Sequence, residues 1–173
     1  MRMDVPRTLA VLDPVYKLLK GVPTDSPLAS AYWRKKQGPP ADPDPDRDGC
    51  GLIWCSPVLP CTGTAAREVT ALASRLLLEH GFEPQMSISM ATERTLVCVI
   101  TISYDRELAG EDARARDCYR RLLDALLERG YPPYRLPVSS MHAASAGRGY
   151  DRAVAAIKAS FDPQGIQIGR AHV

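Results

Sequence analysis

A tyrosine and an arginine stand side by side in a proline-rich stretch of the chain, at Tyr134 and Arg135. Pro132, Pro133 and Pro137 restrict the backbone on both sides of the pair. A phenol can donate or accept a hydrogen bond, and a guanidinium is a planar, permanently charged fork. The pair is therefore suited to holding an aromatic anion or a carboxylate. The alternative is a strand with a core tyrosine and a surface arginine.

Other side chains are candidates for proton transfer or for ligand contact. His142 titrates near neutral pH, so it is a candidate proton shuttle or, alternatively, a solvated loop histidine. Glu93, at a predicted hairpin turn, is a candidate general base or a solvated turn carboxylate. Tyr32 and Trp33 either wall an aromatic ligand or pack an N-terminal arm against the sheet. Asp105, beside an arginine, is interpreted as part of an exposed ion pair.

Composition narrows the class of protein. The 173 residues are 45% hydrophobic and 24% charged, with a net charge of +2, which is typical of a globular domain and disfavours nucleic acid or an anionic membrane as partner. The five cysteines show no Cys-x-x-Cys spacing, so we expect reduced thiols and no metal site. No apolar run approaches the roughly 20 residues of a membrane span. The first residues do not resemble a secretory signal, so we expect a cytoplasmic protein.

Apolar periodicity and turn residues predict the elements that position these side chains. Helices are expected over 5–20 (with a kink at Pro14), 28–36, 65–80, 111–129 and 150–161, and strands over 51–59, 86–90, 94–104 and 133–140. This order predicts an α+β fold, a ferredoxin-like (split βαβ) antiparallel sheet with helices on one face, plus an N-terminal helical arm. We divide the chain into the arm (1–37), a Pro/Asp-rich linker (38–48) and the α+β domain (49–173).

Short motifs in a fixed order resemble a known family. They are Gly21-Val-Pro-Thr-Asp, Ala31-Tyr-Trp-Arg, Asp48-Gly-Cys-Gly-Leu-Ile-Trp-Cys-Ser-Pro-Val, Thr92-Glu-Arg, Tyr104-Asp-Arg, Tyr134-Arg and Asp162-Pro-Gln-Gly-Ile. Together they resemble the C-terminal cap domain of the 4-phenol oxidising flavoenzymes, the family of vanillyl-alcohol oxidase, 4-cresol dehydrogenase and eugenol hydroxylase.

The resemblance implies roles for three residues. Tyr134 and Arg135 match the pair that binds the substrate's phenolate, and Arg170 matches the basic residue that closes a terminal motif beside the flavin. No segment resembles the half of the family that cradles FAD, and no glycine-rich phosphate-binding loop appears. Residues 42–56 contain neither the histidine nor the tyrosine that tethers flavin in several members, and Leu52 stands near that position.

These observations leave three functions open. The first is a cofactor-independent enzyme of secondary metabolism acting on a phenolic or indolic molecule, by a Pictet–Spengler-type condensation of an aromatic amine with an aldehyde. Such a reaction needs mainly orientation and proton transfer. The second is the cap subunit of a split FAD-dependent phenol oxidase or dehydrogenase, with FAD shared with a partner chain. The third is a non-catalytic aromatic-binding module. We also expect a homodimer, formed through the sheet or the arm.

Overall fold

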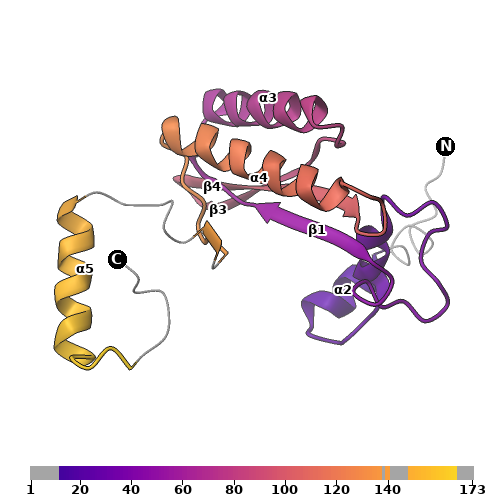
Figure 1. The fold of residues 1–173 in the computed structure, drawn as a ribbon, viewed down its shortest axis with the longest axis horizontal. Coiled ribbons are helices and arrows are strands. Elements are labelled where there is room, and N and C mark those ends of the chain that lie inside the picture. The colour runs from indigo at the N-terminus through magenta and orange to yellow at the C-terminus, as the bar shows by residue number, and fades with distance from the viewer. Residues whose placement is uncertain (1–11, 138, 141–147, 167–173) are drawn as a thin grey trace, which may run out of the picture. The chain divides into compact units, whose positions relative to one another are not determined.

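The computed structural model describes residues 12–137, 139–140 and 148–166 (Figure 1). Its contacts divide the chain into two compact units. The first unit takes in the chain up to Trp54 together with Ser74–Gln85 and Thr101–Tyr119; the second takes in Cys55–Ala73, Met86–Ile100 and the chain from Arg120 onward. The division into arm, linker and domain proposed from the sequence stays a prediction.

A four-stranded sheet is built around one long strand. Its strands are β1 (Cys50–Cys55), β2 (Val58–Pro60), β3 (Gln85–Thr92) and β4 (Thr95–Asp105). β1, β2 and β3 all pair with β4. β2 and β4 are antiparallel, with Val58 opposite Val97, and the bond from the Arg106 N–H to the Gly49 carbonyl continues the same register along β1. The predicted strand 51–59 is thus present, but interrupted at Ser56-Pro57.

The β3–β4 hairpin is confirmed, and its turn lies at Glu93-Arg94. In β4 the side chains of Cys98, Ile100 and Ile102 are fully buried. The residues between them, such as Val99, are partly exposed. This alternation is what a strand produces when one of its faces is covered.

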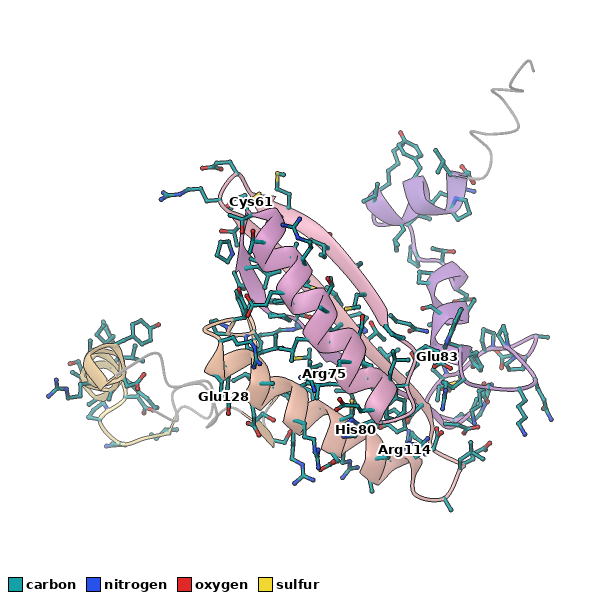
Figure 2. The ribbon with its side chains drawn as sticks, turned by 90° about the horizontal axis from the view of Figure 1, so that it is seen from above. Cys61, Arg75, His80, Glu83, Arg114 and Glu128 are labelled. Carbon is teal, nitrogen blue, oxygen red and sulfur yellow. The ribbon has the colours of Figure 1, made fainter. Side chains whose placement is uncertain are left out.

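Helices α3 (Gly63–Glu79) and α4 (Glu111–Glu128) cover the sheet, as their apolar spacing predicts. Side by side in Figure 2, they make contact where the Cys118 thiol lies 3.9 Å from the Leu76 carbonyl oxygen. Their inward side chains are buried: Val69, Leu72, Leu76 and Leu77 on α3, and Cys118, Leu122 and Leu126 on α4. The predicted α+β class, an antiparallel sheet packed with helices, is confirmed.

The arm differs from its prediction. Pro14 lies in the first turn of α2 (Asp13–Leu19), a position that suits proline. The first part of the predicted helix 5–20 lies outside the described residues, so the predicted kink stays a prediction. The predicted helix 28–36 is a 3₁₀ helix, η1 (Ser26–Tyr32). α5 (Arg148–Phe161) is present near its predicted position. No helix of the described residues is long and apolar enough to cross a membrane.

The fourth strand predicted over 133–140 is reduced to an isolated bridge between Pro57 and Pro133. The Val58 N–H donates to the Pro132 carbonyl at 2.9 Å, and the Tyr134 N–H donates to the Ser56 carbonyl at 3.2 Å. Proline supplies no N–H, so a segment with prolines at 132, 133 and 137 cannot extend a ladder of backbone hydrogen bonds. Residue 138 lies outside the described residues.

Candidate functional site

A backbone hydrogen bond fixes the position of the Tyr134–Arg135 pair, and the side chains of both residues are exposed. The Tyr134 N–H bonds to Ser56 at the break between β1 and β2, inside the second unit. The Tyr134 side chain is 53% exposed, and the Arg135 guanidinium carbon lies 5.5 Å from the centre of its ring. That is the distance of a cation–π contact, so phenol and guanidinium are presented together as a polar pair.

The described contacts of this pair include none of the other predicted site residues. Glu93 is exposed at the hairpin turn of the second unit. Trp33 is 61% exposed, whereas Tyr32 is only 3% exposed, and both belong to the first unit. His142 and Arg170 lie outside the described residues. The site roles assigned to these residues stay predictions.

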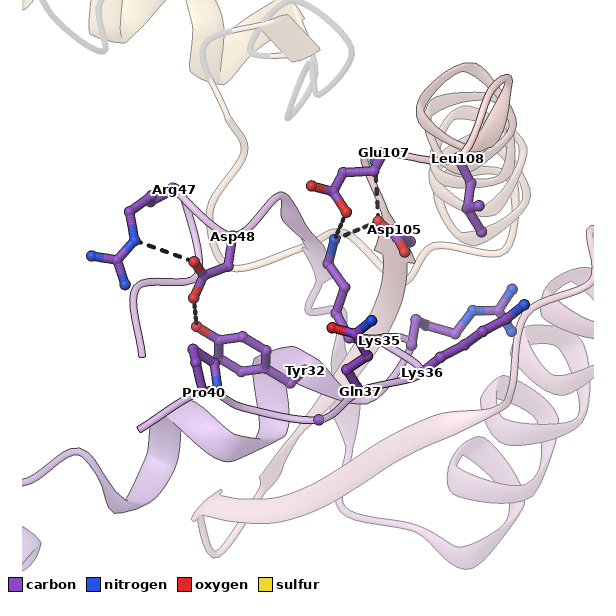
Figure 3. A pocket seen from close by; sticks show the side chains of 12 residues that line it. Tyr32, Lys35, Lys36, Gln37, Pro40, Arg47, Asp48, Asp105, Glu107 and Leu108 are labelled. Carbon is purple, nitrogen blue, oxygen red and sulfur yellow. Dashed lines mark hydrogen bonds and ion pairs between the residues drawn. The ribbon is translucent and has the colours of Figure 1, made fainter. Parts of the chain in front are cut away.

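The first unit contains a cavity of about 560 Å³ (Figure 3). Its walls come from the end of the arm, from the linker, and from the end of β4 with the loop after it. The lining residues are Tyr32, Arg34, Lys35, Lys36, Gln37, Gly38, Pro40, Arg47, Asp48, Asp105, Glu107 and Leu108. Neither Tyr134 nor Arg135 is among them. The arm and the linker together therefore build a site-sized hollow, which the sequence did not predict.

Hydrogen bonds and ion pairs from Tyr32 and Lys35 fix the end of the arm at this cavity, and Figure 3 shows them as dashed lines. The Tyr32 hydroxyl donates to Asp48 at 2.5 Å. The Lys35 ammonium contacts Asp105 at 2.7 Å and Glu107 at 2.9 Å. The pKa of Tyr32 is raised to about 12, first by burial and then by its bond to the Asp48 carboxylate. The phenol of Tyr32 is therefore a neutral donor at physiological pH.

A third anchor lies beside the cavity. The Arg34 guanidinium contacts Glu83 at 2.8 Å and Glu111 at 3.0 Å, and the side chain of Glu111 is only 7% exposed. Burial alone would raise the pKa of Glu111, but the Asp105 N–H and the Arg34 guanidinium outweigh it, so the pKa lies below its usual range. The pKa of Asp105 is also lowered, because Lys35 and the Glu107 N–H outweigh its burial.

These anchors correct one interpretation of the sequence. Asp105 does not form an exposed pair with its neighbour: it is 8% exposed and binds Lys35, while Arg106 binds Asp46 at 2.6 Å. The two residues of each ion pair lie about 60 to 70 positions apart in the sequence, so no local spacing predicts these pairs. The signal present in the sequence was the basic run Arg34-Lys-Lys, opposed by several separate acids.

Four of the five cysteines are shielded from solvent. Cys50, Cys55, Cys98 and Cys118 are buried, and Cys61 is partly exposed. Burial raises the pKa of Cys98 and of Cys118 to about 11, which keeps both as thiols. Over the described ranges, no three His, Cys, Asp or Glu side chains cluster in a way that could hold a metal ion.

Comparison with known proteins places the fold. No protein-family model matches the chain. It is 44% identical over 147 residues, 84% of its length, to the 1'-carboxy-chondrochloren decarboxylase of Chondromyces crocatus. It is 29% identical over 152 residues, 87% of its length, to the 4-cresol dehydrogenase [hydroxylating] flavoprotein subunit of Pseudomonas putida. The chain spans about a quarter of the length of these curated relatives, 27% and 26%.

Solved structures agree. A p-cresol methylhydroxylase with substrate bound matches 65% of this chain and 22% of its own, with a TM-score of 0.61 and 30% identity. A 4-ethylphenol oxidase from Gulosibacter chungangensis in complex with isoeugenol shares the fold over 68% of this chain and 23% of its own, with a TM-score of 0.62 and 22% identity. The chain is homologous to the C-terminal cap region of the flavoprotein family of 4-cresol dehydrogenase and p-cresol methylhydroxylase.

Proposed function

We propose that this chain is the substrate-covering cap of an FAD-dependent enzyme that oxidises or oxidatively decarboxylates a 4-substituted phenol. The names of the relatives support this class of reaction and substrate, since they include a decarboxylase and a 4-cresol dehydrogenase. The observation that carries the proposal is the presentation of Tyr134 and Arg135 as an exposed polar pair on a fixed backbone.

The chemistry of the pair suits a phenolate. Arg135 offers N–H donors and a full positive charge, and Tyr134 offers a hydroxyl donor; a phenolate oxygen accepts both. Binding the substrate as its phenolate makes the aromatic ring electron-rich, which favours loss of a hydride from the substituent carbon attached opposite the oxygen; FAD, when bound, would supply the acceptor. The pair would therefore both orient the substrate and prepare it for oxidation.

In this proposal the described residues do not hold a complete FAD by themselves. One common type of dinucleotide site has a parallel strand that runs through a glycine-rich turn into a helix, whereas the β2–β4 pairing here is antiparallel. Where β2 leads into α3, the Ala65 N–H at the helix start already bonds the Thr62 hydroxyl at 3.3 Å. In this proposal FAD is held by polypeptide outside the described residues, on the same chain or on a partner subunit.

Exposed apolar side chains support the proposal that another domain or subunit packs against this chain. On β1, Leu52 is 40% and Trp54 54% exposed. On α5, Tyr150, Ile157 and Phe161 follow helical spacing and are all more than half exposed. Apolar side chains exposed together on one element, as on β1 and separately on α5, are typical of an interface. A homodimer is the competing arrangement and, like the cytoplasmic location, stays a prediction.

The test compares the isolated chain with a complex of the chain and an FAD-binding polypeptide. We expect the isolated chain to be colourless, and to form a yellow complex when co-expressed with the FAD-binding remainder of the Chondromyces crocatus relative. The complex should oxidise 4-alkylphenols. Arg135→Lys should lower kcat/KM by at least about tenfold, because a lysine cannot present the planar fork. Arg94→Lys, an exposed arginine of the same unit, is the matched control.

Two results would contradict the proposal. One is a complex in which Arg135→Lys and the control behave alike. The other is an isolated, colourless chain that condenses an aromatic amine with an aldehyde, in a reaction lost with Glu93→Gln or His142→Gln. That result would establish the cofactor-independent condensation instead. Binding of phenols without turnover in either setting would leave the third function, the aromatic-binding module.

A further inference from the structure

Helix α5 is accessible to solvent along its whole described length. Every residue from Gly149 to Phe161 is exposed or half-exposed. A helix of about 12–15 residues is only marginally stable in water by itself, and helices in proteins gain most of their stability by packing an apolar face against a neighbour. The 14 residues of α5 lie in that length range, so a surface that covers its apolar side chains would stabilise it.

The large apolar side chains of α5 form one stripe whose order is symmetric. Tyr150, Val154, Ile157 and Phe161 are separated by four, three and four positions, which is the spacing of the seam between two paired helices. The side chains of Tyr150, Ile157 and Phe161 are 63%, 60% and 86% exposed. In either direction the stripe is aromatic, β-branched, β-branched, aromatic. A second copy of the stripe that runs the opposite way therefore places aromatic against aromatic and aliphatic against aliphatic, as a twofold interface requires.

The side chains beside the stripe favour the same antiparallel arrangement. Asp151 and Lys158 lie on one side of it, seven positions apart, so antiparallel pairing brings Asp151 of each copy beside Lys158 of the other. In a parallel pair they would face Ala153 and Ser160, which carry no charge. Lys158 also keeps its bond to Asp162 at 2.8 Å, so the added attraction acts on orientation more than on affinity. Because Ala153 and Ser160 are small, the two helices can approach closely.

We propose that α5 pairs with α5 of a second copy of this chain, antiparallel, about a twofold axis between Val154 and Ile157. One short helix from each copy buries less than the roughly 800 Å² per partner of a standard interface, so the expected Kd is about 10–100 µM. The expected homodimer would then form through α5 and not through the sheet or the arm. This pairing does not depend on the proposed function, and it leaves β1 for the domain or subunit that binds FAD.

Sedimentation velocity of the full chain, from about 1 to about 300 µM, tests the pairing, and a dimer should form as concentration rises. Ile157→Glu should raise the Kd at least about tenfold, because it sets a carboxylate against Val154 of the other copy. Ala159→Glu is the matched control. It adds the same charge to an exposed position on the opposite side of α5, so it should leave the Kd within about twofold of wild type.

A mixing experiment tests the antiparallel order. Val154→Lys alone should also weaken the dimer at least about tenfold, because each new lysine would face an isoleucine. An equimolar mixture of the Val154→Lys and Ile157→Glu chains should associate at least about tenfold more tightly than either alone, since the new lysine then faces the new glutamate. In a parallel pair position 154 faces 154 and position 157 faces 157, so mixing would restore nothing.

Three results would overturn the proposal. The first is a chain that stays monomeric over the whole concentration range. The second is a dimer whose Kd is the same in Ile157→Glu and Ala159→Glu, because association would then use another surface. The third is a mixture that associates no more tightly than its separate components. Val154 and Ile157 are half-exposed and exposed, so their replacement leaves the fold of the monomer intact.

Discussion

Replacing Glu111 with glutamine should destabilise the protein far more than replacing an exposed glutamate does. Glu111 begins α4 and accepts three hydrogen bonds, from the Asp105 N–H at 2.8 Å, from Arg34 at 3.0 Å and from Arg114 at 2.5 Å. Its side chain is 7% exposed, so water cannot replace lost partners. A carboxylate at this position also benefits from the positive end of the helix dipole.

The magnitude follows from these contacts. A hydrogen bond to a charged group contributes about 1.5–3 kcal/mol, and glutamine keeps one acceptor for the Asp105 N–H. Arg34 retains Glu83 at 2.8 Å, which limits the penalty of leaving a guanidinium unpaired. We therefore expect Glu111→Gln to lower the free energy of unfolding by about 2 kcal/mol, and Tm by about 4–8 °C.

Urea unfolding followed by circular dichroism measures this difference. Glu79→Gln is the matched control, because Glu79 forms an exposed i,i+4 pair with Arg75 whose loss should cost less than about 0.5 kcal/mol. The pH dependence gives a second check. The pKa of Glu111 is lowered in the folded state, so its contribution is present above the unfolded value, about 4, and is lost as pH falls through the folded pKa.

The gap between wild type and Glu111→Gln should therefore begin to shrink as pH falls below the unfolded pKa, about 4, and should close once pH is below the lowered folded pKa, where both side chains are uncharged. The reasoning is refuted if Glu111→Gln costs no more than Glu79→Gln at pH 7. A gap that stays constant down to strongly acidic pH would also refute it, because the stabilisation would then not come from the carboxylate's charge.

Three further outcomes are expected. Gly51→Ala should cost about 1–3 kcal/mol in urea unfolding, because its Cβ would lie 2.4 Å from the Tyr104 ring, whereas Gly149→Ala, with open space around it, should not destabilise. In the folded protein Cys61 alone should react with a thiol reagent at pH 8, since the other four cysteines are buried; a second reactive thiol would contradict this. Tyr32→Phe should make the linker 38–48 a faster site of limited proteolysis, because its bond to Asp48 is lost; an unchanged cleavage rate would reject that tie.

The sequence predicted the elements whose stability is local. α3 and α4 follow from apolar residues at helical spacing, and the β3–β4 hairpin follows from two β-favouring runs around a short turn. Each observed boundary lies within a few residues of the predicted one. In these segments periodicity alone decides which face is buried, so tertiary context could not reverse the assignment.

Two features were not predicted from the sequence. The fate of the predicted fourth strand depends on missing backbone N–H donors, and the cavity depends on ion pairs between residues far apart in the sequence. The segment after Gly130 has strand-like composition, but its prolines lack the N–H groups that a ladder requires, so it forms one bridge to Pro57. The cavity depends on Lys35 meeting Asp105 across 70 positions, and Arg34 meeting Glu111 across 77. The sequence shows a basic run and several separate acids, but it does not show which cation meets which acid, because each of these side chains could equally be solvated.

The exposure of the Tyr134–Arg135 pair predicts how its affinity for a phenolate depends on a covering body. Two unit charges 4 Å apart attract by about 1 kcal/mol in bulk water but about 4 kcal/mol near a protein surface that excludes much of it. Because Tyr134 is 53% exposed, the attraction between the pair and a phenolate in the isolated chain should be close to the bulk-water value. The gain of about 3 kcal/mol on covering the pair corresponds to roughly 100-fold in Kd.

We therefore expect 4-cresol, titrated by calorimetry at a pH where it is ionised, to bind the isolated chain at least about 100-fold more weakly than the complex with the FAD-binding remainder. Arg135→Gln, which removes the positive charge, should abolish most of that difference, and Arg94→Gln should preserve it. If the isolated chain binds 4-cresol as tightly as the complex does, the pair already lies in a water-excluding environment, and a covering body is not what completes the site.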